Sequence, residues 1–243
     1  MLETIAIVFI VLAAAFLQGL TGFGFGLIAL PLFGFFLDIK TSVPLMVLLA
    51  VIISLYLAVR LRKSIHLQCT FTLMAASILG IPLGVYALRQ IPTRGLSVGV
   101  GVIIVAFTSY QFLVRPEPRT FGKRMTVLAG FCSGLLGGSL GVGGPPVIIY
   151  TALQPWTKDQ TKATLACFFA LSGLAIIIVQ AASGMITSEV LHLYGLSLPA
   201  LLIGIFLGTK AYERLSDRGY RQLALVLVFL LGCMMLYRNI LPI

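Results

Sequence analysis

Two glycine-rich segments carry the residue types that could bind an anion through the backbone. The first is Gly19-Leu-Thr-Gly-Phe-Gly-Phe-Gly26, and 115 residues later its spacing returns in Gly134-Leu-Leu-Gly-Gly-Ser-Leu-Gly-Val-Gly-Gly-Pro-Pro146. Glycine lets a ligand approach the backbone closely, and a helix that begins beside it directs N–H donors and the positive end of its dipole toward an anion. The segments therefore predict two cradles for a tetrahedral or pyramidal oxyanion.

Polar side chains accompany the glycines and complete the predicted site. Gln18 and Ser133 occupy equivalent positions, which favours a shared pocket with neutral hydrogen bonds. The predicted substrate-binding residues in the two segments are Gln18, Thr21, Gly22, Gly24, Gly26, Ser133, Gly137, Gly138, Ser139, Gly141, Gly143 and Gly144. At Gly24 and Gly143 we expect a positive φ and close backbone approach, which a β-branched side chain would block.

The alternative is that the glycines only allow helices to pack closely. We favour this alternative for Gly19 and Gly134 taken singly. The pairing of the two breaks favours a binding site for the motif as a whole, because matching interruptions in two halves of a membrane chain point to the substrate site of a transporter.

Two lysines near the motifs are also assigned to the predicted site. Lys40 and Lys162 begin the helices next to the breaks, on opposite membrane faces, where positive charges at the entrances would attract an anion. The sequence supports equally well a second interpretation, in which both are interfacial lysines whose stems lie along apolar surface.

The composition places these motifs in a membrane. The chain is 59% hydrophobic and only 10% charged, whereas charged residues make up about 25% of a soluble domain. Lipid offers unpaired backbone groups no partner, so irregular backbone in an apolar stretch is tolerated only beside a polar cavity or protein. The net charge of +10 is confined to short loops, which indicates membrane topology and not nucleic-acid binding. The four cysteines have no paired spacing and no nearby histidine cluster, so we expect neither a metal site nor a cofactor.

The apolar stretches predict an all-α, polytopic membrane protein with one transporter domain over residues 1–243. A span needs about 20 apolar residues. The predicted full spans are 41–59, 67–88, 95–114, 161–182, 190–208 and 222–237. The stretches 4–37 and 125–154 are each interrupted by a motif, so each is predicted to form two short helices. This gives ten helices, or eight spans with re-entrant hairpins.

The basic residues predict how these helices are oriented. If both motif regions return the chain to the side it came from, the loops 60–63, 115–124, 158–162 and 210–221 share one face and hold 13 of the 17 Lys and Arg residues. The positive-inside rule places that face in the cytoplasm, so both termini are expected outside the plasma membrane. Each half then crosses an odd number of times, which makes the halves inverted repeats.

The repeats cover about 4–114 and 125–238, and they match at ordered positions beyond the motifs. Lys40 and Ser42 match Lys162 and Thr164 at an offset of 122, and Gly80 and Gly84 match Gly204 and Gly208 at an offset of 124. Inverted repeats place the substrate site near the midplane, here between the two glycine motifs.

The paired motifs, the basic loops and the chain length resemble the TauE/SafE-type family of sulfite and organosulfonate transporters over essentially the whole chain. The most specific part is Gly137-Gly-Ser-Leu-Gly-Val-Gly-Gly-Pro-Pro146, followed by a short polar loop and a Lys-Ala-Thr helix start at Lys162. The resemblance implies export, less often uptake, of sulfite, sulfoacetate or a related small anion, and it does not fix the ligand.

We therefore expect a secondary carrier that exports a small sulfur-containing anion by alternating access, with an anion channel or an uptake permease as the alternative. The sequence lacks His-Glu-x-x-His, Gly-x-Ser-x-Gly and paired membrane carboxylates, so no catalytic residue and no enzyme is expected. No acidic residue lies at a span centre, which leaves the coupling ion open. The expected partners are the anion and the lipid bilayer. Two short halves are compatible with a homodimer.

Overall fold

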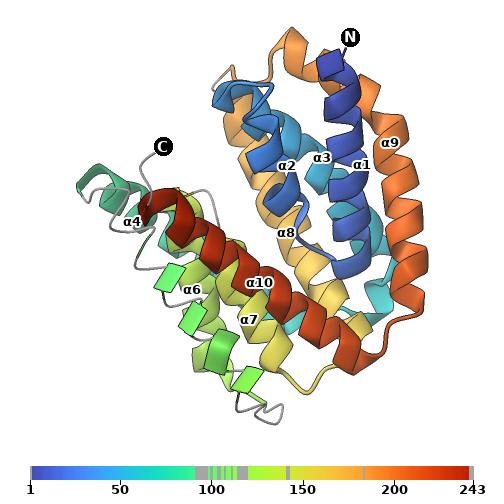
Figure 1. Cartoon of the computed structure of the whole chain (residues 1–243). Coiled ribbons are helices and arrows are strands. Elements are labelled where there is room, and N and C mark those ends of the chain that lie inside the picture. The colour runs from blue at the N-terminus through green and yellow to red at the C-terminus, as the bar shows by residue number, and fades with distance from the viewer. Residues whose placement is uncertain are drawn as a thin grey trace. The chain divides into compact units, whose positions relative to one another are not determined.

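The fold is built from helices. The computed structural model describes residues 2–90, 98, 101–102, 105–106, 108–110, 112–113, 120–140, 143–182 and 184–240. These residues form α-helices and one short 3-10 helix, with no strand among them, and they confirm the predicted all-α class (Figure 1). The elements are α1 (Leu2–Thr21), α2 (Phe25–Phe33), α3 (Ile39–Arg60), η1 (Arg62–Ser64), α4 (Leu67–Gln90), α6 (Lys123–Leu140), α7 (Gly144–Leu153), α8 (Lys158–Ala182), α9 (Ser188–Glu213) and α10 (Asp217–Ile240).

Two compact units share these helices. The first unit contains Met1–Ile65 and Lys162–Ser216, which supply α1, α2, α3, most of α8 and α9. The second unit contains His66–Thr161 and Asp217–Ile243, with α4, α6, α7 and α10. Each unit thus combines segments that are far apart in the sequence. The two glycine motifs fall in different units.

Most predicted spans coincide with helices. Among the described residues, α1, α3, α8 and α9 are long and apolar enough to cross a membrane. The predicted spans 67–88 and 222–237 lie within α4 and α10, while most of 95–114 lies outside the described residues. These helices confirm a multi-pass membrane protein.

Polar caps begin several helices a few residues before the apolar stretches that predicted them. Asp38 accepts hydrogen bonds from the backbone N–H groups of Lys40 and Thr41 and begins α3. Thr157 and Gln160 bond reciprocally, each side chain accepting from the other's backbone N–H, at the start of α8. Such caps satisfy the amides that have no intrahelical partner.

The two interrupted regions do form helix pairs, but their members are unequal. α1 has 20 residues and α2 nine, and α6 has 18 residues and α7 ten. At 1.5 Å per residue, α1 is about 30 Å long, which is enough to span, and α2 is only about 13 Å long. The prediction of a short first helix was wrong for α1, which is long and apolar enough to cross a membrane. Apolar composition does not mark where a helix ends, and here glycines set the end.

Glycine allows one close helix pair in each unit. α1 packs on α9 in the first unit and α4 on α6 in the second. A Cβ at Gly208 would overlap the Phe16 carbonyl oxygen, and a Cβ at Gly80 would overlap the Phe131 carbonyl oxygen. Phe16 and Phe131 are 115 residues apart, the offset of the motifs. The two pairs are therefore equivalent contacts.

This packing register corrects the offset predicted for α4 and α9. It matches Gly80 with Gly208, an offset of 128 instead of 124. The neighbours of Gly19 and Gly134 agree, because these are Ile205 and Ser77, which again differ by 128. Both segments contain Gly-x-x-x-Gly, so a shift of one helical turn still matches one glycine with another, although Gly84 then matches Tyr212.

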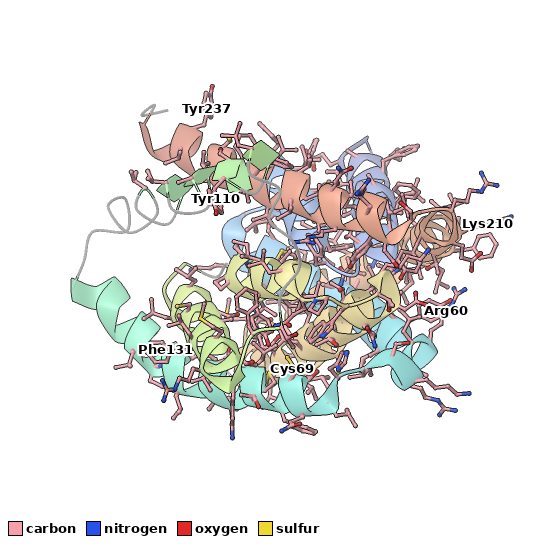
Figure 2. All side chains as sticks on the ribbon, turned by 90° about the horizontal axis from the view of Figure 1, so that it is seen from below. Arg60, Cys69, Tyr110, Phe131, Lys210 and Tyr237 are labelled. Carbon is pink, nitrogen blue, oxygen red and sulfur yellow. The ribbon has the colours of Figure 1, made fainter. Side chains whose placement is uncertain are left out.

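Basic loops gather at one end of each unit. In the first unit Arg60 forms an ion pair with Glu213, with 2.7 Å between Nη2 and Oε1. Figure 2 shows Arg60 and Lys210 at the same end of this unit. In the second unit the Lys158 N–H donates to Asp217 Oδ1 at 2.9 Å. Within each unit, loops that the predicted topology assigns to one face are thus neighbours.

Candidate functional site

The first glycine break is a turn with its own hydrogen bonds. Gly22 and Gly24 have φ angles of 85° and 95°, which glycine adopts without strain. The Gly22 N–H donates to Gln18 O at 2.7 Å. The Thr21 hydroxyl lies 2.8 Å from Leu17 O and 2.6 Å from Phe23 O, so its proton can serve either carbonyl. The bond from Gly22 satisfies a carbonyl in the last turn of α1 that the helix would otherwise leave unpaired.

The break opens onto the N-terminus of α2. Gly24 is the N-cap of this helix and supplies no side-chain hydrogen bond. Phe25, Gly26 and Leu27 follow, each with a backbone N–H in the first turn, where amides have no intrahelical acceptor and the helix dipole is positive. The first break therefore offers N–H donors, as an anion cradle requires.

Lys162 is fully buried beside this break, with a side chain that is 0% exposed. Its Nζ donates to Gly19 O at 2.6 Å and lies 3.5 Å from the centroid of the Tyr212 ring. A Cβ at Gly22 would lie 2.8 Å from Lys162 Cγ. The ammonium group thus binds the carbonyl end of α1, where the helix dipole is negative.

The two matched lysines therefore differ. Lys162 is neither an entrance charge nor an interfacial lysine, and both sequence interpretations of it were wrong. The reason is that its side chain lies against Gly19 and Gly22 and against the Tyr212 ring of α9. Lys40 is exposed in the first turn of α3. An exposed lysine and a buried one look alike in sequence when both begin a helix.

Gln18 joins α1 to α3 in the same unit. Its side chain is 3% exposed, and Nε2 donates to Ser54 Oγ at 2.8 Å and to Ala50 O at 3.3 Å. Among the described residues, Gln18 Oε1 has no hydrogen-bond partner. A buried acceptor without a donor costs about 1–3 kcal/mol, so this oxygen is suited to accept from a bound molecule or water.

The second break is closed in another way. The Ser133 hydroxyl donates to the Gly143 carbonyl oxygen across the break. Gly143 has φ −82°, so the predicted positive φ at this position was wrong. What requires glycine there is space, because a Cβ at Gly143 would lie 2.7 Å from Ser133 O.

The helix after the second break has fewer donors. α7 begins at Gly144 and continues with Pro145 and Pro146. Proline has no N–H, so these positions cannot donate to an anion. Treating the two breaks as equal cradles overlooked this difference, which the Pro-Pro pair already showed in the sequence.

The structure brings some of the predicted site residues together and separates others. Gln18, Thr21, Gly22, Gly24 and Lys162 surround the first break. Gly26 lies in α2 against Met46 of α3, and Gly137 lies beside Gly143 in the second unit. Gly138 and Ser139 are in the last turn of α6, and Gly141 lies outside the described residues.

Two further residues at the first break were not predicted. They are Tyr212, which lies under the Lys162 ammonium, and Ser54, which accepts from Gln18. Ser54 could have been found as a polar residue inside the apolar stretch 41–59. Nothing in the sequence distinguishes Tyr212 from an interfacial aromatic.

Comparison with known proteins agrees with the family resemblance seen in the sequence. The sequence model of the family described as sulfite exporter TauE/SafE matches residues 7–235. A protein of Cupriavidus necator, described as a probable sulfite/organosulfonate exporter TauE, is 24% identical over 222 residues, which cover 87% of this chain and 85% of that protein. No solved structure matches the chain. Because the family match covers nearly all of the sequence, including both glycine breaks, the chain belongs to the TauE/SafE family of sulfite exporters.

Proposed function

We propose that this protein exports a small sulfur-containing oxyanion, sulfite or a small organosulfonate, across the plasma membrane as a carrier. Family membership makes it a membrane transporter and not an enzyme. The substrate class is supported by the family description and by the relative from Cupriavidus necator. The inverted repeats predicted from the sequence remain part of this proposal.

The observation that carries the proposal is the chemistry of the first break. The first turn of α2 has three amides in sequence and no side-chain cap from Gly24, and Lys162 places a positive charge beside the same break, against Gly19 and Gly22. An oxyanion offers several acceptors for such donors, and its charge is favoured both by the helix dipole and by the lysine. We assign the substrate to this break in preference to the second.

The proposed site lies toward the basic end of the first unit. α1 reaches the length of a span before Gly22 ends it, and Lys162 contacts Tyr212, one residue before the ion-paired Glu213. We therefore propose this position in place of the midplane position predicted from the repeats. The outcome that contradicts it is full sulfite binding by Gly24→Val protein, because a valine at φ 95° would disrupt the amides of α2.

The first experiment tests ligand class and mechanism together. Purified protein is heated with sulfite, thiosulfate, sulfate, sulfoacetate or taurine, and we expect its own substrate to raise the melting temperature. Proteoliposomes loaded with that anion should then accumulate labelled anion by counterflow. Counterflow with saturation indicates a carrier, whereas linear flux without counterflow would indicate a channel.

A second experiment tests orientation. In protein whose native cysteines are replaced, Gly122→Cys and Ser188→Cys are labelled from outside intact cells. Both positions are exposed, and a side chain at Gly122 meets no atom within 4 Å. We expect label at position 188 and none at 122 until the cells are permeabilised, as the positive-inside rule predicts. The reverse pattern would mean that the basic loops lie outside the cell, so that the proposed site would lie toward the outer face of the membrane.

A further inference from the structure

The end of α1 has the geometry of a cation site. The last carbonyls of a helix lack intrahelical donors and lie at the negative end of its dipole. In carriers with interrupted helices, such carbonyls commonly coordinate the coupling Na⁺ or H⁺. Here Gln18 O accepts from the Gly22 N–H at 2.7 Å, and Gly19 O accepts from Lys162 Nζ at 2.6 Å. A cation is therefore already present at this helix end.

The surroundings of Lys162 hold that cation in place. The ammonium group faces the Tyr212 ring at 3.5 Å from its centroid, within the range of a cation–π interaction. The stem fills the space left by the missing side chain of Gly22, since a Cβ there would lie 2.8 Å from Lys162 Cγ. The lysine thus contacts α1, the break and α9 at once, and the whole side chain is buried.

We infer that Lys162 is a tethered cation that occupies the site a coupling cation would take, so that export requires no cotransported Na⁺ or other metal cation. This inference rests on the proposed function and names its coupling. A covalently attached ammonium group is present in every cycle, so no ion gradient is needed to fill the site. The anion then leaves along the membrane potential, which favours efflux by about 2.3 kcal/mol per charge per 100 mV.

The test uses electroneutral sulfite counterflow, which needs no imposed potential. Wild-type proteoliposomes are compared with Na⁺, K⁺ or choline as the only monovalent cation on both sides. We expect the same rate in all three. A rate that falls about tenfold in choline would show that a small external cation is required and would overturn the inference.

The matching variant removes the ammonium group. Lys162→Ala should lower counterflow about tenfold, in line with the loss of a dipole contact and a cation–π contact. Ethylammonium should restore part of the rate because it can occupy the vacated space, whereas tetraethylammonium should not. Lys210→Ala is the control, since Lys210 is exposed, lies 5.8 Å from the Phe206 ring and caps no broken helix end. It should show neither loss nor rescue.

Melting temperature separates this role from a purely structural one. Ethylammonium should raise the melting temperature of Lys162→Ala protein and leave that of Lys210→Ala unchanged. A folded Lys162→Ala protein that transports normally, or whose defect no amine relieves, contradicts the inference. If Lys162→Ala protein does not insert, the cation dependence of the wild type decides alone. Failure of the wild type to bind any of the five anions would instead refute the proposed function.

Discussion

The two glycine breaks share a spacing but are held by different chemistry. At the first, glycines with φ of 85° and 95° form the turn and a buried lysine binds the end of the preceding helix. At the second, a serine hydroxyl bonds Gly143, whose φ is an ordinary −82°. A repeated pattern thus specifies where a helix ends, while the residues around it decide what that end can bind.

The same difference extends to the helices that follow. α2 begins with three residues that each have a backbone N–H, whereas two of the first three residues of α7 are prolines. Under the proposed function, the first break binds the anion and the second fixes α6 against α7. Substitutions at equivalent positions can separate these two roles.

The largest difference in stability is expected between Gly134→Ala and Gly19→Ala. These positions are equivalent in the repeat, and both face a partner helix. A Cβ at Gly134 would overlap the Ser77 carbonyl oxygen, whereas at Gly19 it would lie 3.1 Å from Ile205 O. Overpacking against backbone costs about 1–3 kcal/mol or more, so Gly134→Ala should lower the melting temperature strongly and Gly19→Ala only slightly.

Gly195→Ala is the control for both, because a Cβ there meets no atom within 4 Å. Thermal unfolding in detergent measures all three variants. Equal melting temperatures for Gly19→Ala and Gly134→Ala protein would show that α4 and α6 can separate without loss, contrary to the packing described. The sequence interpretation that these two glycines serve packing is supported by their contacts.

The next effect separates binding from packing. Gly24→Ala places a side chain at φ 95°, which costs about 1–2 kcal/mol, and it disturbs the amides of α2. Gly143→Ala meets Ser133 O at 2.7 Å but leaves those amides intact. Both variants should be less stable, and only Gly24→Ala should lose the rise in melting temperature with sulfite. A loss of that rise in Gly143→Ala alone would move the site to the second break.

Sequence reasoning located both breaks because the glycine clusters repeat with the same spacing in two long apolar stretches. It also identified most helices, since an apolar stretch of about 20 residues has few alternatives in a membrane. It failed on the length of α1 and on the register of α9. Hydropathy does not show at which glycine a helix ends, and two Gly-x-x-x-Gly segments still match at one glycine after a shift of one helical turn.

The site was predictable only where backbone geometry dominates. Gly22 and Gly24 were chosen for their residue type, and their φ angles are positive. Lys162 was also chosen, but for a role at the surface. Its burial depends on Tyr212, which is 50 residues away in the sequence and reaches it only through the packing of α9. No local pattern contains that contact.

A smaller effect is expected from the polar residues that are equivalent across the breaks. Ser133→Ala removes the donor to Gly143 O, which should lower stability by about 1 kcal/mol without changing sulfite affinity. Gln18→Leu removes the bonds to Ser54 and Ala50, which hold the end of α1 against α3 beside the first break. We expect similar destabilisation and weaker sulfite binding, measured by calorimetry. Weaker binding in Ser133→Ala and not in Gln18→Leu would reverse the assignment of the two breaks.

The smallest effect is expected at Lys40, the exposed counterpart of Lys162. An exposed lysine can act on an anion only through the solvent, where salt screens charges beyond about 8 Å at physiological ionic strength. Lys40→Gln should therefore change apparent sulfite affinity by no more than about twofold at low salt, and by nothing measurable at high salt. Lys63→Gln, also exposed and in η1 after α3, is the control. If Lys40→Gln instead weakened binding about tenfold at both salt concentrations, Lys40 would contact the anion directly. Lys40 and Lys162 would then both act on the anion, and the difference between an exposed and a buried lysine would have no functional consequence.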